Sequence, residues 1–346
     1  MADAELTSPR PVAAAAKAES RNGFWRSKAA QRFRRNPLAV VGLLVVFAFV
    51  VLAVFAPAFT NLGRSCLRDL GLSASTQYDY KNPAKPVFWR AVFSPPATCY
   101  QIPREGFAAQ PRTAEASGTL LGTTSGGYDI FYGLVWGTRT AFRIGLIVVG
   151  ISLAVGIVLG SLSGYIGGVF DNIAMRFTDV IISLPNLVVA LVIVMVLGKS
   201  IENLMLAIAM VAWPSYARLM RGEVLRVKEQ DYVNSAIALG RRPLGVIFRH
   251  VLPNAIGPLI IVASLDIGSV VLTAAALSFL GLGAEVGYAD WGQMISFARD
   301  WILGTPGNPL AYWYVSFWPG LIIVLFVLGW NLLGDAFRDV LDPRST

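Results

Sequence analysis

Residues with the types and spacing of enzyme chemistry are few in this 346-residue chain and do not cluster. Gly198-Lys199-Ser200 ends like a phosphate-binding loop, but such a loop needs another glycine five positions earlier, where Ile193 stands. His250 is the only histidine, and one imidazole with no cysteine or acidic cluster beside it cannot hold a metal ion. The sequence therefore predicts no catalytic, cofactor or metal site, and we expect His250 to be structural.

Asp266 occupies the least favourable place for an ionisable group, because it stands mid-way along an apolar block. An ionised carboxylate is costly inside a bilayer and usually faces protein or water there. Two roles remain open for it: lining a translocation path, or making a buried hydrogen bond. Pro185 and Pro214 lie in two other apolar blocks, where each is expected to kink or break a helix.

The apolar blocks that hold these residues set the fold class. Apolar residues make up 55% of the chain and charged residues 14%, against roughly a quarter charged in a soluble domain. About 20 helical residues cross the hydrocarbon core of a bilayer. Six blocks approach or exceed that length: 38–59, 142–165, 173–197, 204–220, 255–282 and 317–333. We therefore expect an all-α integral membrane protein with about six transmembrane helices.

Basic residues flank the apolar blocks and orient them. Eight Lys and Arg precede Leu38 and seven lie in 218–253, but 283–316 has only one. Because cytoplasmic loops carry such an excess, we expect both termini in the cytoplasm. The expected segments are a cytoplasmic 1–37, helix one over 38–59, an extracytoplasmic loop 60–138, a membrane core 139–335 with a cytoplasmic loop 218–253, and a cytoplasmic tail 336–346. The net charge of +8 thus fits contact with membrane lipid, and no nucleic-acid partner is expected.

The second apolar block carries glycine at every fourth position, at 156, 160, 164 and 168. One face of this helix is therefore nearly bare backbone, which lets another membrane helix approach closely. We expect tight packing there, within the chain or against a sister subunit.

Most of the functional information lies in the loop 218–253. Its apolar spacing predicts a short amphipathic helix that begins near Asp231, which could cap it. Gly240 suits the turn after this helix, because glycine adopts a positive φ at no steric cost. Pro243 fits the first turn of a second short helix, and Pro253 ends the segment. Two short helices joined at a glycine make a compact knob, the shape that a docking element needs.

The knob resembles the coupling motif of ABC importer permeases, in which A-L-G is followed after nine residues by H-V-L-P. Further segments resemble the dipeptide/oligopeptide (and nickel) permease family: FRRNPLAVVGLL, LLGTTSGGYDIFYGLVWGTRTAF, LSFLGLG with DWGQMI, and PGLIIVLFVLGWNLLGDAFRDVLDPR. The chain is identified as a member of this family, of the C type. The resemblance implies that ATPase coupling uses Tyr232, Asn234, Ser235, Ala236, Leu239, Gly240, Arg242, His250 and Pro253.

By this resemblance the chain would pair with a second, homologous permease and form a path across the cytoplasmic (inner) membrane. An extracellular solute-binding protein would deliver di- or oligopeptides, and two ATPase subunits would dock on the knob and its counterpart. Those partners would hydrolyse the ATP, since this chain has no nucleotide-binding loop. Nickel, glutathione and sugars are alternative cargoes within the family.

Three positions depart from the family pattern. Its Glu-Ala-Ala at the coupling helix is Asn234-Ser235-Ala236, and its Gly-Arg-Asp before helix two is Gly127-Tyr128-Asp129. A glutamate common in the fifth helix is Ala274. The acidic coupling residue and one polar residue of the path are therefore missing here.

Residues 60–118 are poorly covered by the resemblance and form an insertion. Cys66 and Cys99 both lie in it, and outside the membrane we expect a disulfide between them over two free thiols. Phe88, Trp89, Phe93 and Tyr100 would supply a small core. We expect the insertion to cap the outer mouth or to meet the receptor that delivers the solute, and the alternative is that it has no role in transport.

A competing class is a stand-alone secondary transporter or channel. Such proteins show intramembrane ionisable networks or paired broken helices in repeated halves. This sequence has isolated carboxylates and no internal repeat. A membrane enzyme would need clustered nucleophiles, bases or metal ligands, which the sequence does not show.

Overall fold

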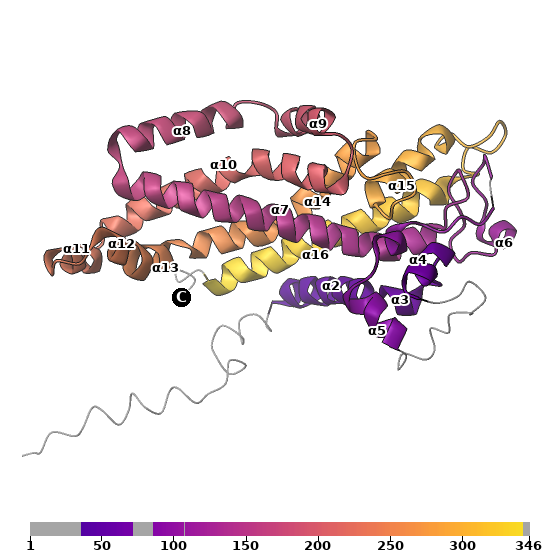
Figure 1. Ribbon diagram of the computed structural model, residues 1–346, viewed down its shortest axis with the longest axis horizontal. Helices are drawn as coiled ribbons and strands as arrows, with labels where there is room; N and C mark the ends of the chain where they lie inside the picture. Colours follow the sequence, from indigo (N-terminus) through magenta and orange to yellow (C-terminus); the bar gives the residue numbers. More distant parts are fainter. Residues whose placement is uncertain (1–35, 72–85, 107, 342–346) are drawn as a thin grey trace, which may run out of the picture.

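The architecture is an elongated helical bundle (Figure 1). The computed structural model describes residues 36–71, 86–106 and 108–341, and within these ranges the chain has helices and isolated β-bridges but no strand. The all-α class is thereby confirmed for the described residues. Most of the expected segment 1–37, part of the insertion and the end of the tail 336–346 lie outside them. The α-helices are α2 (Pro37–Val54), α3 (Ala56–Phe59), α4 (Arg64–Asp69), α5 (Pro86–Phe93), α6 (Ala114–Ser117), α7 (Ile130–Ile166), α8 (Gly168–Ile182), α9 (Asn186–Leu197), α10 (Ile201–Lys228), α11 (Asp231–Ala238), α12 (Pro243–Val246), α13 (Leu252–Ala255), α14 (Gly257–Phe279), α15 (Trp291–Ala298) and α16 (Trp313–Leu341).

The two ends of the bundle differ in structure. Helices α11, α12 and α13 lie at one end, which we call the knob end, and α4, α5 and α6 lie at the other, which we call the insertion end (Figure 1). Helices α7, α10, α14 and α16 run along the bundle between these ends. The bundle therefore separates the knob from the insertion by the length of its longest helices.

Side-chain caps fix where several of the long helices begin. Asp129 accepts a hydrogen bond from the Tyr132 backbone N–H at 3.2 Å and so starts α7 at Ile130. The predicted loop 60–138 thus ends earlier than expected, because 130–138 is helical. Ser200 caps α10 by accepting from the Asn203 N–H at 3.0 Å. The Gly198-Lys199-Ser200 tripeptide is therefore a helix start.

Among the described residues, four helices are long and apolar enough to cross a membrane: α2, α7, α14 and α16. The pair α8 and α9 adds a fifth if it counts as one bent span. The predicted block 204–220 lies in α10, which is not one of these four helices. The count of six spans is not confirmed.

The two prolines behave differently. Helices α8 and α9 meet at 89°, with Pro185 at the start of α9. This break agrees with the expectation for Pro185, whose ring cannot continue a helix from the preceding turn. Pro214 lies inside α10, which continues to Lys228, so it does not break its helix.

The glycines of α7 pack against α10, as expected for a bare helix face. A Cβ atom on Gly156 would lie 2.3 Å from the Tyr216 Cβ, and one on Gly160 would lie 2.4 Å from the Ala217 carbonyl oxygen. Gly164 similarly faces Val224. Gly168 does not share this face, because the chain turns at φ +69° at residue 167 and Gly168 begins α8.

The insertion is held together by a Cys66–Cys99 disulfide with a Cα–Cα distance of 4.5 Å. Its buried apolar residues include Leu67, Leu70 and Ala91. The expected aromatic core is wrong for Trp89 and Phe93, which stack on each other on the surface. The side chain of Phe88 lies outside the described set, and Tyr100 packs edge-on against Trp136 of α7.

Arg139 ties the insertion to the bundle. Its guanidinium donates to the carbonyls of Val54 at the end of α2 and of Ala91 and Val92 at the end of α5, at 3.1, 3.2 and 2.5 Å, and also to Ala53. Helix C-termini carry partial negative charge and unpaired carbonyls. The Arg139 side chain of α7 thus supplies hydrogen-bond donors to unpaired carbonyls at the C-terminal ends of both α2 and α5.

Candidate functional site

The knob comprises residues 231–253. Helix α11 spans Asp231–Ala238 as expected, but its N-cap is Gln230, whose side chain makes no capping bond. Asp231 lies in the first turn, where its charge favours the helix dipole, and does not cap the helix. Pro253 does not end the segment, since it lies in the first turn of α13, just before α14.

Gly240 closes α11 with a glycine-dependent turn. Its φ is +77°, its N–H donates to the Ile237 carbonyl at 2.9 Å, and the next N–H, of Arg241, donates to Ala236 at 3.3 Å. This pair of bonds is the Schellman arrangement, which places the residue after the C-cap in the left-handed region. Pro243 then occupies the first turn of α12. The glycine therefore sets the angle between the two knob helices.

Replacing Gly240 by valine should weaken coupling while leaving the chain inserted in the membrane. A β-branched residue at positive φ costs about 1–2 kcal/mol, so the turn would open to relieve it. Gly245→Val is the matched control, because Gly245 lies in the same knob with ordinary φ and open space around its Cα. The measurement is the ratio of solute moved to ATP hydrolysed in the reconstituted transporter. Equal ratios in the two variants would show that the turn has no part in coupling.

A small hydrophobic core of its own supports the knob. Val233 of α11, Val246 of α12 and Val251 after it are buried against the end of α10 and the start of α14. The remaining members of this cluster are Met220, Val224, Val227, Ala255 and Leu259. The knob is thus packed on the ends of two long helices, α10 and α14.

The outer surface of the knob is apolar and basic. Leu239, Leu244 and Phe248 are 85%, 65% and 66% exposed, with Tyr232 and Ile237 also exposed around them. Arg241, Arg242 and Arg249 of the knob are also exposed. Contiguous exposed apolar side chains with a polar rim mark sites of protein association. We call Tyr232, Ile237, Leu239, Leu244 and Phe248 the knob patch.

The predicted coupling residues divide between the surface and the interior of the knob. Tyr232, Asn234, Ser235, Leu239, Gly240 and Arg242 are exposed, whereas Ala236 is buried. His250 is half-buried, and its Nε2 has no hydrogen-bond partner among the described residues. Ile237, Leu244 and Phe248 of the patch were not among the predicted coupling residues. The available signal for Leu244 and Phe248 was that they lie four residues apart in the helical segment that Pro243 begins, a spacing that puts two side chains on one helical face.

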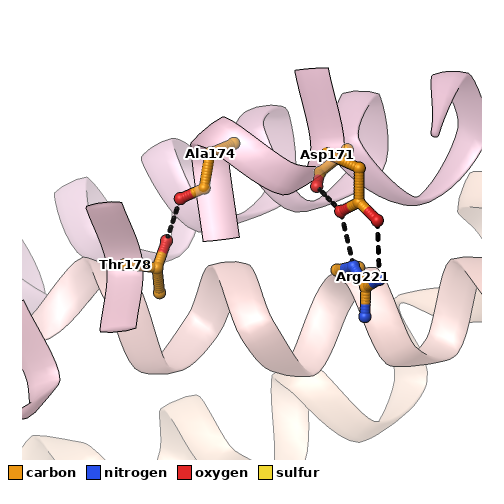
Figure 2. A network of polar contacts seen from close by, with 5 residues as sticks. Asp171, Ala174, Thr178 and Arg221 are labelled. Carbon is orange, nitrogen blue, oxygen red and sulfur yellow. Dashed lines mark hydrogen bonds and ion pairs between the residues drawn. The ribbon is translucent and has the colours of Figure 1, made fainter. Parts of the chain in front are cut away.

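Helix α8 is fastened to α10 by two ion pairs. Figure 2 shows the Asp171 carboxylate facing the Arg221 guanidinium, and two hydrogen bonds of 2.6 Å join them. Asp171 also accepts from Ser163 of α7, and Arg218 pairs with Asp179 further along α8. Bidentate carboxylate–guanidinium pairs fix geometry as well as charge. These two ion pairs, which we call the clamp, therefore hold α8 against α10, although few residues of α8 are buried.

Asp266 lies near the middle of α14, where the Tyr216 hydroxyl of α10 donates to its Oδ2 at 2.7 Å. It also lines a cavity of about 190 Å³ between α9, α10 and α14. The structure thus shows the hydrogen bond, and the role of Asp266 in a translocation path stays a prediction. Ala274, where the family has a glutamate, is buried and contributes no polar group.

A second cavity, of about 510 Å³, lies at the insertion end. Thr98 and Tyr100 of the insertion line it together with Arg143, Glu202 and other residues of the bundle. Arg143 and Glu202 form an ion pair of 3.0 Å, and both remain well exposed. The insertion and the start of α10 thus line one cavity, which includes charged side chains.

Comparison with known proteins gives two family matches. Residues 156–346 match the family described as binding-protein-dependent transport system inner membrane component. Residues 23–86 match the N-terminal transmembrane domain of oligopeptide transport permease C. The second match runs into the insertion, so the first part of 60–118 follows a family pattern more closely than expected.

Individual relatives agree with these matches. The dipeptide transport system permease protein DppC of Alkalihalophilus pseudofirmus is 35% identical over 92% of this chain and 90% of its own length. The probable D,D-dipeptide transport system permease protein DdpC of Escherichia coli is 43% identical over 65% of this chain and 73% of its own. The glutathione transport system permease protein GsiD of Pectobacterium atrosepticum is 38% identical over 66% of this chain and 74% of its own length.

Proposed function

Because the chain belongs to the family of binding-protein-dependent transport system inner membrane components, we propose that it is one of the two permeases of an ABC importer for di- and oligopeptides. It is a multi-pass inner membrane protein. The observation that carries the proposal is the knob patch, an exposed apolar surface on a separately packed element that joins α10 and α14. Two ATPase subunits would dock on this patch and its counterpart, and would hydrolyse the ATP.

The proposed topology places the knob end in the cytoplasm and the insertion end outside. Six crossings follow if α2, α7, the bent pair α8–α9, α10, α14 and α16 each cross once. The start of α10 supports this count, because Ser200 and Glu202 line the same cavity as Thr98 of the insertion, while its end packs against the knob. The excess of Lys and Arg in 218–253 supports the orientation.

Two further partners belong to the proposal. A second, homologous permease would cover part of the apolar surface of α8 and α9, with lipid covering the rest; Ile173, Phe177, Val188 and Val192 are among the exposed side chains there. An extracellular solute-binding protein would meet the insertion end, where the cavity carries charges of both signs. Glutathione is the alternative cargo, since one relative bears that name.

Mild-detergent purification of the tagged chain from its host, followed by mass spectrometry and uptake assays, tests this function. Recovery of a second permease and of ATPase chains, with peptide uptake that requires ATP, is the expected result. Recovery of the chain alone, moving solute in liposomes without ATP, would identify a secondary transporter. ATP-driven uptake of glutathione but not of peptides would correct the cargo.

A further inference from the structure

The carboxylate of Asp266 is not neutralised by a cation. Its Oδ2 accepts from Tyr216, and its Oδ1 has only a long contact of 3.4 Å to the Ser269 hydroxyl. The ion pairs of the described residues involve other carboxylates: Glu202, Asp179, Asp171 and Glu223. A charged group near the centre of a span is costly unless a counter-ion or water stabilises it. Asp266 therefore has the capacity for one further cationic partner.

The cavity beside Asp266 is large enough to admit such a partner. Its volume is about 190 Å³, and its wall includes Asn186 of α9, Ser215 of α10 and Ser269 of α14, all of them exposed. It therefore opens on the surface of the subunit. Since a water molecule takes ~30 Å³ in the liquid, the cavity has room for a group of several heavy atoms, such as an alkylammonium.

The hydroxyls of α14 present acceptors to this cavity. The Ser269 hydroxyl donates to the Asp266 carbonyl at 3.0 Å, and the Thr273 hydroxyl donates to the Ser269 carbonyl at 2.9 Å. A hydroxyl has one proton, so each oxygen keeps its lone pairs for a ligand. The Tyr216 proton is likewise used on the carboxylate. No lysine or arginine of the part of the chain that the structure describes lines the cavity, which is thus rich in acceptors and carries the carboxylate of Asp266.

We propose that this cavity is a transient binding subsite for the primary ammonium group of the cargo, with Asp266 as its counter-charge. An ammonium is compact and carries three donors and no acceptor, which matches a carboxylate flanked by hydroxyl oxygens. A purely structural Asp266–Tyr216 bond would need neither the cavity nor the free acceptors. The link to cargo depends on the proposed function, whereas the preference for ammonium depends on the cavity alone.

A thiol placed in the cavity can measure this preference. Both native cysteines are in the disulfide, so Ala212→Cys, on the α10 wall, gives this chain one reactive thiol. In the assembled transporter, with partner chains freed of reactive cysteines, its rates with aminoethyl and sulfonatoethyl methanethiosulfonate are compared. Each rate is divided by the rate of the same reagent with a free thiol in solution. The cationic reagent should then react about tenfold faster than the anionic one, the scale expected for one nearby charge. Asp266→Asn should remove this advantage, and Asp335→Asn, an exposed carboxylate on α16, should retain it.

Uptake of a lysine-containing dipeptide by the complete transporter provides the second readout. Asp266→Asn should lower it several-fold, and Asp335→Asn should not. The proposal is overturned if the reagent preference persists in Asp266→Asn, or if that variant loses the preference and transports normally. A wild-type transporter that shows the preference but no ATP-driven uptake would overturn the importer assignment and the role in cargo passage together, leaving only an ammonium-binding cavity.

Discussion

We expect Leu239→Asp to remove the ATPase subunits from the assembled transporter. Leu239 is 85% exposed, the largest exposed fraction in the knob patch. A docked partner would bury its side chain, and an aspartate there would have to lose its hydration without a partner. The expected loss is about 3 kcal/mol of association free energy, or roughly 100-fold in affinity. Co-purification of the ATPases and ATP turnover in the complex measure it.

Leu303→Asp is the matched control for this variant. Leu303 is 87% exposed but lies at the insertion end, in the loop between α15 and α16. Leu303→Asp replaces an equally exposed leucine by the same charged residue as Leu239→Asp does. Because Leu303 lies far from the knob, ATPase binding should be unchanged. If both variants lose the ATPases, the effect is general destabilisation. If neither loses them, the ATPases dock elsewhere.

The knob was the part of the site best predicted from sequence, and its chemistry explains why. Its helix starts and turns depend on local features: Gly240 at a positive φ and Pro243 in a first helical turn. Such residues restrict their own backbone wherever they stand. The sequence left open which apolar side chains face outward. Val246 is buried and Phe248 is exposed, although both are apolar, because other helices pack on Val246 and not on Phe248.

Contacts between distant segments could not be predicted. Tyr216 and Asp266 are 50 residues apart, and their hydrogen bond depends on how α10 and α14 are packed. The Asp171–Arg221 pair likewise requires α8 to lie along α10. The aromatic core proposed for the insertion failed for a related reason. Hydrophobicity favours burial but does not specify it, and Ala91 and the disulfide fill the space instead.

The glycine spacing of α7 is the exception, because a long-range contact followed from sequence alone. Small residues at every fourth position have few uses in a membrane helix other than close approach of a neighbour. The sequence could not name that neighbour, which is α10, nor exclude Gly168, which the turn at Gly167 takes out of register. The glycine spacing thus predicts that one face of α7 is closely packed, but which helix packs there depends on the connecting loops.

This close approach predicts that Gly160→Ala destabilises the protein although alanine is the better helix former. Its Cβ would lie 2.4 Å from the Ala217 carbonyl oxygen and 2.7 Å from the Met220 Cβ. The first of these is backbone, so α7 and α10 must separate along their shared length. Overpacking of this kind costs about 1–3 kcal/mol. Because α10 carries both Arg221, which pairs with Asp171, and Tyr216, which donates to Asp266, coupled uptake should fall as well.

Gly150→Ala, on the same helix, separates packing from propensity. No atom lies within 4 Å of the position that its Cβ would take. Alanine there should be neutral or stabilising by about 0.5–1 kcal/mol, since it restricts the unfolded chain more than glycine does. Thermal unfolding in detergent should therefore place Gly160→Ala below the native protein by roughly 5 °C and Gly150→Ala at or above it. A joint fall would mean that α7 requires glycine for flexibility, and equal stability in all three would mean that α7 and α10 do not meet as closely as their glycines indicate.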